Sequence, residues 1–167
     1  MLAKHEDAEN RYDKIRRDAL RAISVQVSIP NLKFRLIDQK ALAQAVIWGE
    51  SPNRLATWGW EKYGAFRFSY PKRFELALWH NNQLASISAG RPTYNATGLR
   101  LDFIEKTPND IDIKVFPITL AAMNVYADSL GANELRIMNP INEEVKEYYR
   151  SFGLEYVKKG DYLFTRV

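Results

Sequence analysis

The C-terminal third of the chain contains a helix, a strand and a second helix in close succession, and this order restricts the folds that the sequence can adopt. Residues 117–130 carry apolar side chains at the three-and-four spacing of an amphipathic helix, and residues 134–138 have the composition of a strand. Asn142 suits the N-cap of a second helix that ends at Gly153. A helix of this length connects two parallel strands, so we expect residues 99–105 to lie parallel to the later strand.

The N-terminal region predicts a charged amphipathic helix over residues 4–24. One side carries apolar residues at helical spacing, and the other side interleaves acidic and basic residues, as on a surface helix with ion pairs. This interleaving favours docking or formation of a homodimer over binding to nucleic acid. A short extended segment is expected at residues 25–29, where Val25, Val27 and Ile29 alternate.

The middle of the chain predicts the antiparallel part of a sheet. A strand at residues 32–36 is followed by a helix with Asp38 as its N-cap. Residues 74–89 predict a β-hairpin that turns around residues 80–82. The whole pattern indicates an α+β fold with helices on both faces of the sheet, in one domain over residues 1–167 that includes an N-terminal helical extension over 1–30.

Composition narrows the classes of function. The chain has 24 Lys and Arg against 20 acidic residues, a formal charge of +4, which suits an anionic ligand but also an ordinary solvated surface. It has no cysteine and two histidines, which excludes disulfides, thiolate zinc sites and cysteine nucleophiles, so no metal site is expected. No apolar run of signal-peptide or membrane-spanning type occurs, and we expect a cytoplasmic protein without a membrane partner.

Residues 54–74 combine aromatic and basic side chains. Such a mixture can stack bases or hold an anionic acceptor, but so many aromatics cannot all be exposed, so most are expected to be core. The aromatics are Trp58, Trp60, Tyr63, Phe66, Phe68, Tyr70 and Phe74.

The spacing of residues in the two C-terminal helices can be compared with known families. The residues concerned are Ala127, Gly131, Asn142, Val145, Tyr148, Tyr149, Gly153 and Leu154. In order and spacing they resemble the C-terminal half of the GNAT N-acetyltransferase superfamily, over residues 84–165. The resemblance implies a GNAT-like mixed central sheet flanked by helices, in which the parallel strands 99–105 and 135–139 splay apart to admit acetyl-CoA or another acyl-CoA.

One family motif is missing. GNAT proteins have a glycine-rich loop before the long helix, whose backbone N–H groups bind pyrophosphate. Residues 111–116 here are Ile-Asp-Ile-Lys-Val-Phe, so Phe116 takes the place of a glycine, and Pro117 has no N–H. The positive end of the helix dipole remains. If coenzyme A binds, we expect its pyrophosphate at this helix end, near the backbone N–H groups of residues 112–116, which include Val115 and Phe116, and near the side chain of Lys114.

The resemblance also implies roles for single residues. Tyr149 aligns with the general acid that protonates the leaving thiolate, although packing is an alternative role for it. Asp102 and Glu105 are the available carboxylates for a base, and the backbone near Ile104 and Glu105 would face the thioester oxygen. Two further residues are expected near the cofactor: Asn139, toward the pantetheine arm, and Asn142, for which capping the helix is the favoured role.

The resemblance implies an acyl-CoA-dependent N-acyltransferase that transfers an acetyl group to an unidentified amine held over residues 54–74. The alternative is a GNAT-like domain without coenzyme binding that serves as a binding or assembly module, in contact with nucleic acid. Phe116 and Pro117 favour this alternative. A third reading, acylation of a nucleic-acid base or an aminoacyl-tRNA, combines features of both.

Overall fold

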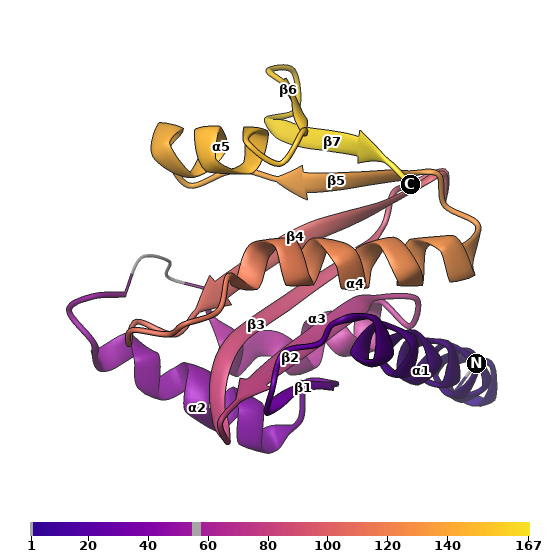
Figure 1. Ribbon diagram of the computed structural model, residues 1–167. Helices are drawn as coiled ribbons and strands as arrows, with labels where there is room; N and C mark the ends of the chain where they lie inside the picture. The colour runs from indigo at the N-terminus through magenta and orange to yellow at the C-terminus, as the bar shows by residue number, and fades with distance from the viewer. Residues whose placement is uncertain (1, 55–57) are drawn as a thin grey trace.

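The computed structural model describes residues 2–54 and 58–167 of the chain (Figure 1). The helical elements are α1 (Leu2–Gln26), α2 (Gln39–Ile47), η1 (Trp48–Glu50), η2 (Trp60–Lys62), α3 (Tyr63–Ser69), α4 (Val115–Leu130) and α5 (Glu143–Arg150). The strands are β1 (Leu32–Arg35), β2 (Phe74–His80), β3 (Gln83–Pro92), β4 (Gly98–Lys106), β5 (Glu134–Met138), β6 (Glu155–Val157) and β7 (Tyr162–Arg166).

The strands form one mixed sheet in the order β1-β2-β3-β4-β5-β7-β6. All neighbours are antiparallel except β4 and β5, which are parallel and are connected through α4. The predicted α+β class, the parallel pair and the helical crossover are therefore confirmed.

Strands β4 and β5 pair only at one end. The pairing runs from Gly98 opposite Glu134 to Leu101 opposite Ile137, and beyond it β4 continues without β5. Asp102 is an additional residue in β4 at this point, since Leu101 lies opposite Gly90 of β3 and Phe103 lies opposite its neighbour Ala89. A β-bulge bends the strand that contains it. The predicted splaying of the two strands thus coincides with a bulge.

Helices cover both faces of the sheet (Figure 1). On one face, called here the α4 face, Leu99 and Leu101 join a core that includes residues of α1, α4 and α5. On the other, the α2 face, Phe103 packs against a second core formed with α2, η2 and α3. Side chains alternate between the faces of a strand, and the bulge at Asp102 shifts this alternation by one residue.

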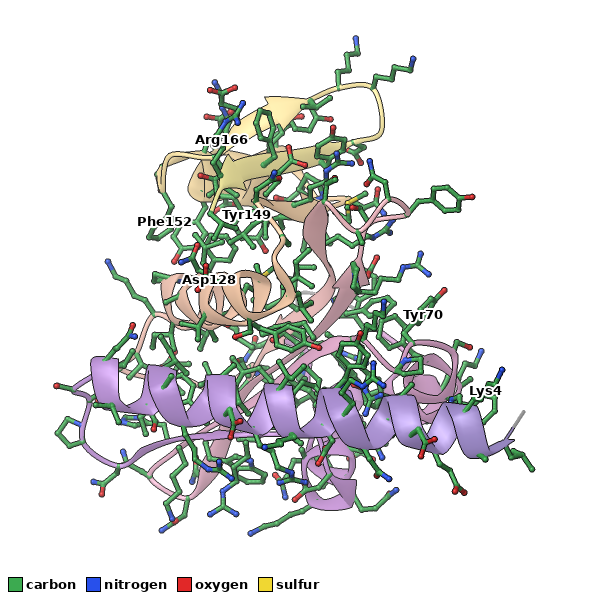
Figure 2. All side chains as sticks on the ribbon, turned by 90° about the vertical axis from the view of Figure 1, so that its right-hand side faces the viewer. Lys4, Tyr70, Asp128, Tyr149, Phe152 and Arg166 are labelled. Atoms are coloured by element: carbon green, nitrogen blue, oxygen red, sulfur yellow. The ribbon has the colours of Figure 1, made fainter. Side chains whose placement is uncertain are left out.

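Helix α1 belongs to the main core. Ala19, Leu20 and Ile23 are buried in the cluster on the α4 face. Helix α1 lies next to α4 and packs against it (Figure 2). The predicted extended segment at residues 25–29 is wrong in its first part, because the helix continues through Gln26 and leaves Val25 exposed. Neither Ser24 nor Val25 is a residue that stops a helix.

The predicted N-cap at Asn142 is confirmed, whereas the helix that was predicted to end at Gly153 ends at Arg150, three residues earlier. The Asn142 side chain accepts a hydrogen bond of 2.8 Å from the N–H of Val145 at the start of α5. Gly131 after α4 and Gly153 after α5 have φ of 74° and 90°, the left-handed conformation that glycine adopts without strain. Helix α4 begins at Val115, two residues before the predicted start at Pro117. Proline is tolerated there because the first-turn N–H groups have no partner within a helix.

Candidate active site

A cleft of about 620 Å³ opens between β4 and β5 where the two strands separate. Its walls come from the free part of β4, the end of β5, the loop before α4, the first turn of α4, and α5. All of the site residues predicted from the sequence line this cleft: Asp102, Ile104, Glu105, Lys114, Val115, Phe116, Asn139, Asn142 and Tyr149. The structure brings these residues together, and their individual roles stay predictions.

The side chain of Tyr149 is buried between α5 and α4, near Phe152 (Figure 2). Its ring stacks on that of Phe116, with 4.1 Å between centroids and 22° between planes. Burial, with a smaller effect of Tyr148, raises the pKa of Tyr149 to about 12. Among the described residues, no side chain or carbonyl accepts a hydrogen bond from its hydroxyl. The phenol therefore stays protonated at neutral pH, and its proton is available to a group bound in the cleft.

Phe116 is the centre of an aromatic cluster that joins α4 to α5. Its ring lies 6.1 Å from Tyr148, 4.1 Å from Tyr149 and 5.4 Å from Phe152, measured between centroids. The side chain that replaces a family glycine is therefore packing between the two helices. Its effect is to fix α5, and with it Tyr149, against the first turn of α4.

The amino end of α4 lies open toward the cleft. Lys114 occupies the N-cap position without making a side-chain cap, and no group in the described ranges accepts from the N–H of Val115 or Phe116. These donors and the helix dipole favour an anion. Asp110 and Asp112, both in the preceding loop, oppose it.

Asp102 lies on the bulge and connects the cleft to two arginines. Its Oδ1 accepts hydrogen bonds from Nε and a terminal nitrogen of Arg100, at 2.8 and 2.5 Å, and its Oδ2 lies 3.8 Å from Nε of Arg91. Burial raises the pKa of Asp102, and the two arginines oppose this shift. Within the described part of the chain, Oδ2 is buried without a hydrogen-bond partner, so this oxygen can accept a proton.

Glu105 is engaged elsewhere. It is 4 % exposed, and its carboxylate accepts hydrogen bonds of 2.7 and 3.0 Å from Arg54 and of 2.9 Å from the indole of Trp60. These contacts attach the segment before α3 to β4. Of the two predicted carboxylates, Asp102 is thus the one with an oxygen that accepts no hydrogen bond within the described residues.

Trp58 contributes to the cleft in a way that the sequence did not reveal. Its indole N–H donates a 3.0 Å hydrogen bond to the carbonyl of Ile104, and its ring meets Phe103 edge-on at 5.2 Å. The N–H and C=O of one strand residue point to the same side. The N–H of Ile104 therefore points in the direction expected for a donor to the thioester oxygen.

The rest of the aromatic and basic region is mainly core. Trp60, Tyr63 and Phe74 are buried, whereas Phe68 is exposed. This agrees with the expectation that most of these aromatics pack. Residues 55–57 of the region lie outside the described residues.

The two asparagines lie at the rim of the cleft. Asn139 leaves β5 with φ of 48°, and its N–H donates to the carbonyl of Asp161 at 2.8 Å. The side-chain oxygen of Asn142 is used by the cap of α5. Over residues 2–54 and 58–167, no cluster of three or more His, Asp or Glu could hold a metal ion, and no helix has the length and apolar character to cross a membrane.

Solved structures match this fold over most of the chain. An acetyltransferase from Streptococcus agalactiae superposes with a TM-score of 0.66 at 9 % identity, over 83 % of this chain and 100 % of that one. A putative acetyltransferase of the GNAT family from Desulfovibrio desulfuricans gives 0.62 at 13 % identity, over 81 % and 98 %. The chain has the GNAT fold.

A third structure with the GNAT fold is the N-acetylglutamate synthase from Neisseria gonorrhoeae, complexed with coenzyme A and N-acetyl-glutamate. It gives a TM-score of 0.62 at 14 % identity, over 84 % of this chain and 36 % of that one. No protein-family model matches the chain, and no curated protein matches its sequence.

Proposed function

We propose that the protein is an N-acyltransferase that transfers an acetyl group from acetyl-CoA to a small amine. The proposal rests on one observation: the part of β4 that does not pair with β5 and the protonated side chain of Tyr149 line the same cleft. Beyond Leu101, β4 pairs with no described strand on the side of β5, although the Ile104 carbonyl accepts from Trp58. The pantetheine arm carries amides that pair with such an edge as an added strand does. Tyr149 lies in the same cleft.

In the proposed reaction the amine nitrogen attacks the thioester carbon, and the carbon–sulfur bond breaks. The N–H of Ile104 stabilises the negative charge that develops on the thioester oxygen. Asp102 takes a proton from the amine, and Tyr149 gives its proton to the departing thiolate. Solvent then returns a proton to Tyr149 and removes one from Asp102.

The solved structures of the same fold support this proposal at the level of the reaction class. The streptococcal and Desulfovibrio matches are described as acetyltransferases, and the gonococcal N-acetylglutamate synthase was solved with coenzyme A. The altered loop predicts weaker binding of the pyrophosphate, since Val115, Phe116 and Lys114 supply few donors.

A calorimetric titration with acetyl-CoA tests the proposal, together with an assay of free coenzyme A released in the presence of amines. The chain has no cysteine, so a thiol reagent detects only the released coenzyme. Saturable binding that weakens about two- to fivefold in Lys114→Ala is expected, because an exposed charge contact is worth up to about 1 kcal/mol. Lys159→Ala, a change at an exposed lysine in the turn between β6 and β7, is the matched control.

The second candidate is a binding module that does not use coenzyme A. Phe116 favours it, because an aromatic cluster has replaced the glycine loop at the end of α4. If millimolar acetyl-CoA gives neither heat of binding nor thermal stabilisation, the acyltransferase proposal is wrong and the binding module is favoured.

A further inference from the structure

Three arginines lie side by side across β3, β4 and β5. Arg91 is opposite Arg100 in the antiparallel pair, and Arg100 is opposite Arg136 in the parallel pair. We call these residues the arginine row. Like charges directly opposite one another destabilise a sheet. Two carboxylates accompany the row, Asp102 and Glu134, so it keeps an excess of positive charge.

The arginine row faces away from α4. Leu99 and Leu101, on either side of Arg100, point into the core on the α4 face, and Leu135 and Ile137 do the same around Arg136. Among the described elements, the helices in substantial contact with β5 and β7 are α4 and α5, whose buried residues belong to that same core. The row therefore lies on a part of the α2 face that these helices leave open.

The guanidinium groups are held in place but are accessible. The side chains of Arg91, Arg100 and Arg136 are 30 %, 26 % and 31 % exposed. The guanidinium of Arg91 lies over the ring of Tyr70 at 4.4 Å and donates to its hydroxyl, and that of Arg136 lies over the ring of Tyr162 at 4.6 Å.

These groups also retain unused donors. Arg136 donates from Nε to Glu134 at 2.8 Å, and its two terminal nitrogens form no hydrogen bond within the described residues. Arginine presents five N–H donors in a fixed fork that matches a carboxylate or a phosphate. A positioned fork with free donors is a preorganised site for such a group.

The row adjoins the point where the chemistry is proposed. Arg100 and Arg136 directly precede Leu101 and Ile137, the last pair before the strands separate. Asp102, which lines the cleft, makes the hydrogen bonds that fix Arg100. An amine that reaches the bulge from the α2 face would bring the remainder of its molecule onto the arginine row.

We propose that the arginine row binds an anionic group of the acceptor, so that the substrate is a small amine carrying a carboxylate or a phosphate. This inference rests on the proposed acyl transfer and adds the class of acceptor. The same charges disfavour a polyamine, because its additional ammonium groups would meet the excess positive charge of the row.

The test compares acetyl transfer to L-glutamate, O-phosphoethanolamine, ethanolamine and spermidine, measured as release of free coenzyme A. We expect one of the two anionic amines to give the highest kcat/KM, and the choice between them identifies the carboxylate or the phosphate. Arg136→Gln should raise KM for that amine by about tenfold or more with kcat little changed, because a charge-assisted pair is lost. KM for ethanolamine should stay the same.

Arg150→Gln is the matched control, since Arg150 is a solvent-exposed arginine of α5 with one ion pair, to Glu147. Arg136→Lys should restore part of the affinity. Thermal unfolding of each variant shows whether the sheet is intact.

Preference for spermidine, or an equal loss with all four amines in Arg136→Gln, would overturn the arginine row as the acceptor site and leave the acyltransferase proposal standing. If no amine is acetylated, calorimetry with L-glutamate and O-phosphoethanolamine on the protein saturated with coenzyme A separates the two ideas. Binding that Arg136→Gln abolishes would sustain the anion site while the proposed reaction fails. Absence of binding would remove the anion site as well.

Discussion

Tyr149 packs on Phe116 and is the proposed general acid, and a single substitution can separate the packing from the proposed chemistry. Tyr149→Phe keeps the ring that stacks on Phe116 and removes only the hydroxyl. In the proposed reaction this change lowers kcat by about 10² to 10⁴, the usual contribution of a general acid, and leaves KM and thermal stability nearly unchanged. Steady-state kinetics with the best acceptor measures the effect.

Tyr148→Phe is the control for this prediction, because Tyr148 also lines the cleft but is 42 % exposed. Equal turnover of wild type and Tyr149→Phe would remove the catalytic role. Tyr149→Ala should cost about 3 kcal/mol of stability through lost packing, whichever role the hydroxyl has.

The spatial relations of some residues could be predicted from the sequence, and those of others could not. Asn142 caps α5, Tyr149 lies within it and Gly153 follows it, so their spacing along the chain alone determines their relation. The contact between Arg54 and Glu105 joins positions 51 residues apart and depends on the path of the segment before α3. The arginine row was missed because its three residues come together only through the registers of two strand pairs.

Helix α1 is an integral element of the fold. Ile23 is almost fully buried in the main core, whereas Val25 is 83 % exposed on the same helix. Ile23→Ala should lower the free energy of unfolding by about 2 to 4 kcal/mol, through lost burial and a residual cavity. Val25→Ala should change it by about 0.5 kcal/mol or less. Urea unfolding of both variants checks the contrast, and equal effects would show that α1 does not dock as described.

Ion pairs also attach α1 to the rest of the molecule. The Glu9 carboxylate accepts hydrogen bonds from Arg16 at 2.9 Å and from two nitrogens of Arg73 at 2.9 and 2.7 Å, and both arginines are buried. Glu9→Gln leaves the two buried cations short of one negative charge and should cost about 3 kcal/mol. Asp18→Asn, which loses only the exposed pair with Arg21, should cost about 0.5 kcal/mol or less.

Sequence patterns located the elements better than their ends. The hairpin of β2 and β3 was predicted because two asparagines suit its turn, where their φ angles are 53° and 64°. The start of α4 was placed too late, because Pro117 suits the first position of a helix and the structure uses it in the third. A proline can occupy any of several positions in the first turn of a helix, so its presence alone does not fix the first residue of α4. The packing of Phe116 against α5 fixes it.

At the scale of the whole molecule, buried tyrosines make the stability depend on alkaline pH. Burial raises the pKa of Tyr126 and of Tyr149 to about 12, and it raises that of Tyr63 further, with Glu75 adding to the shift. An unfolded tyrosine titrates near 10. Between these values the folded chain binds more protons than the unfolded chain. The stabilising contribution is therefore complete below pH 10 and is lost as the pH rises.

The titration of Tyr126 and that of Tyr149 should each lower the free energy of unfolding by about 2 kcal/mol by pH 12. The reason is that the unfolded chain releases these protons more easily than the folded chain. Urea unfolding between pH 8 and 12, followed by tryptophan fluorescence, measures the decline. Tyr149→Phe should make the decline shallower by about 2 kcal/mol while leaving stability at pH 8 unchanged. The same slope in both proteins would mean that the Tyr149 hydroxyl titrates as it does in water, which would contradict the buried position of this side chain between α4 and α5.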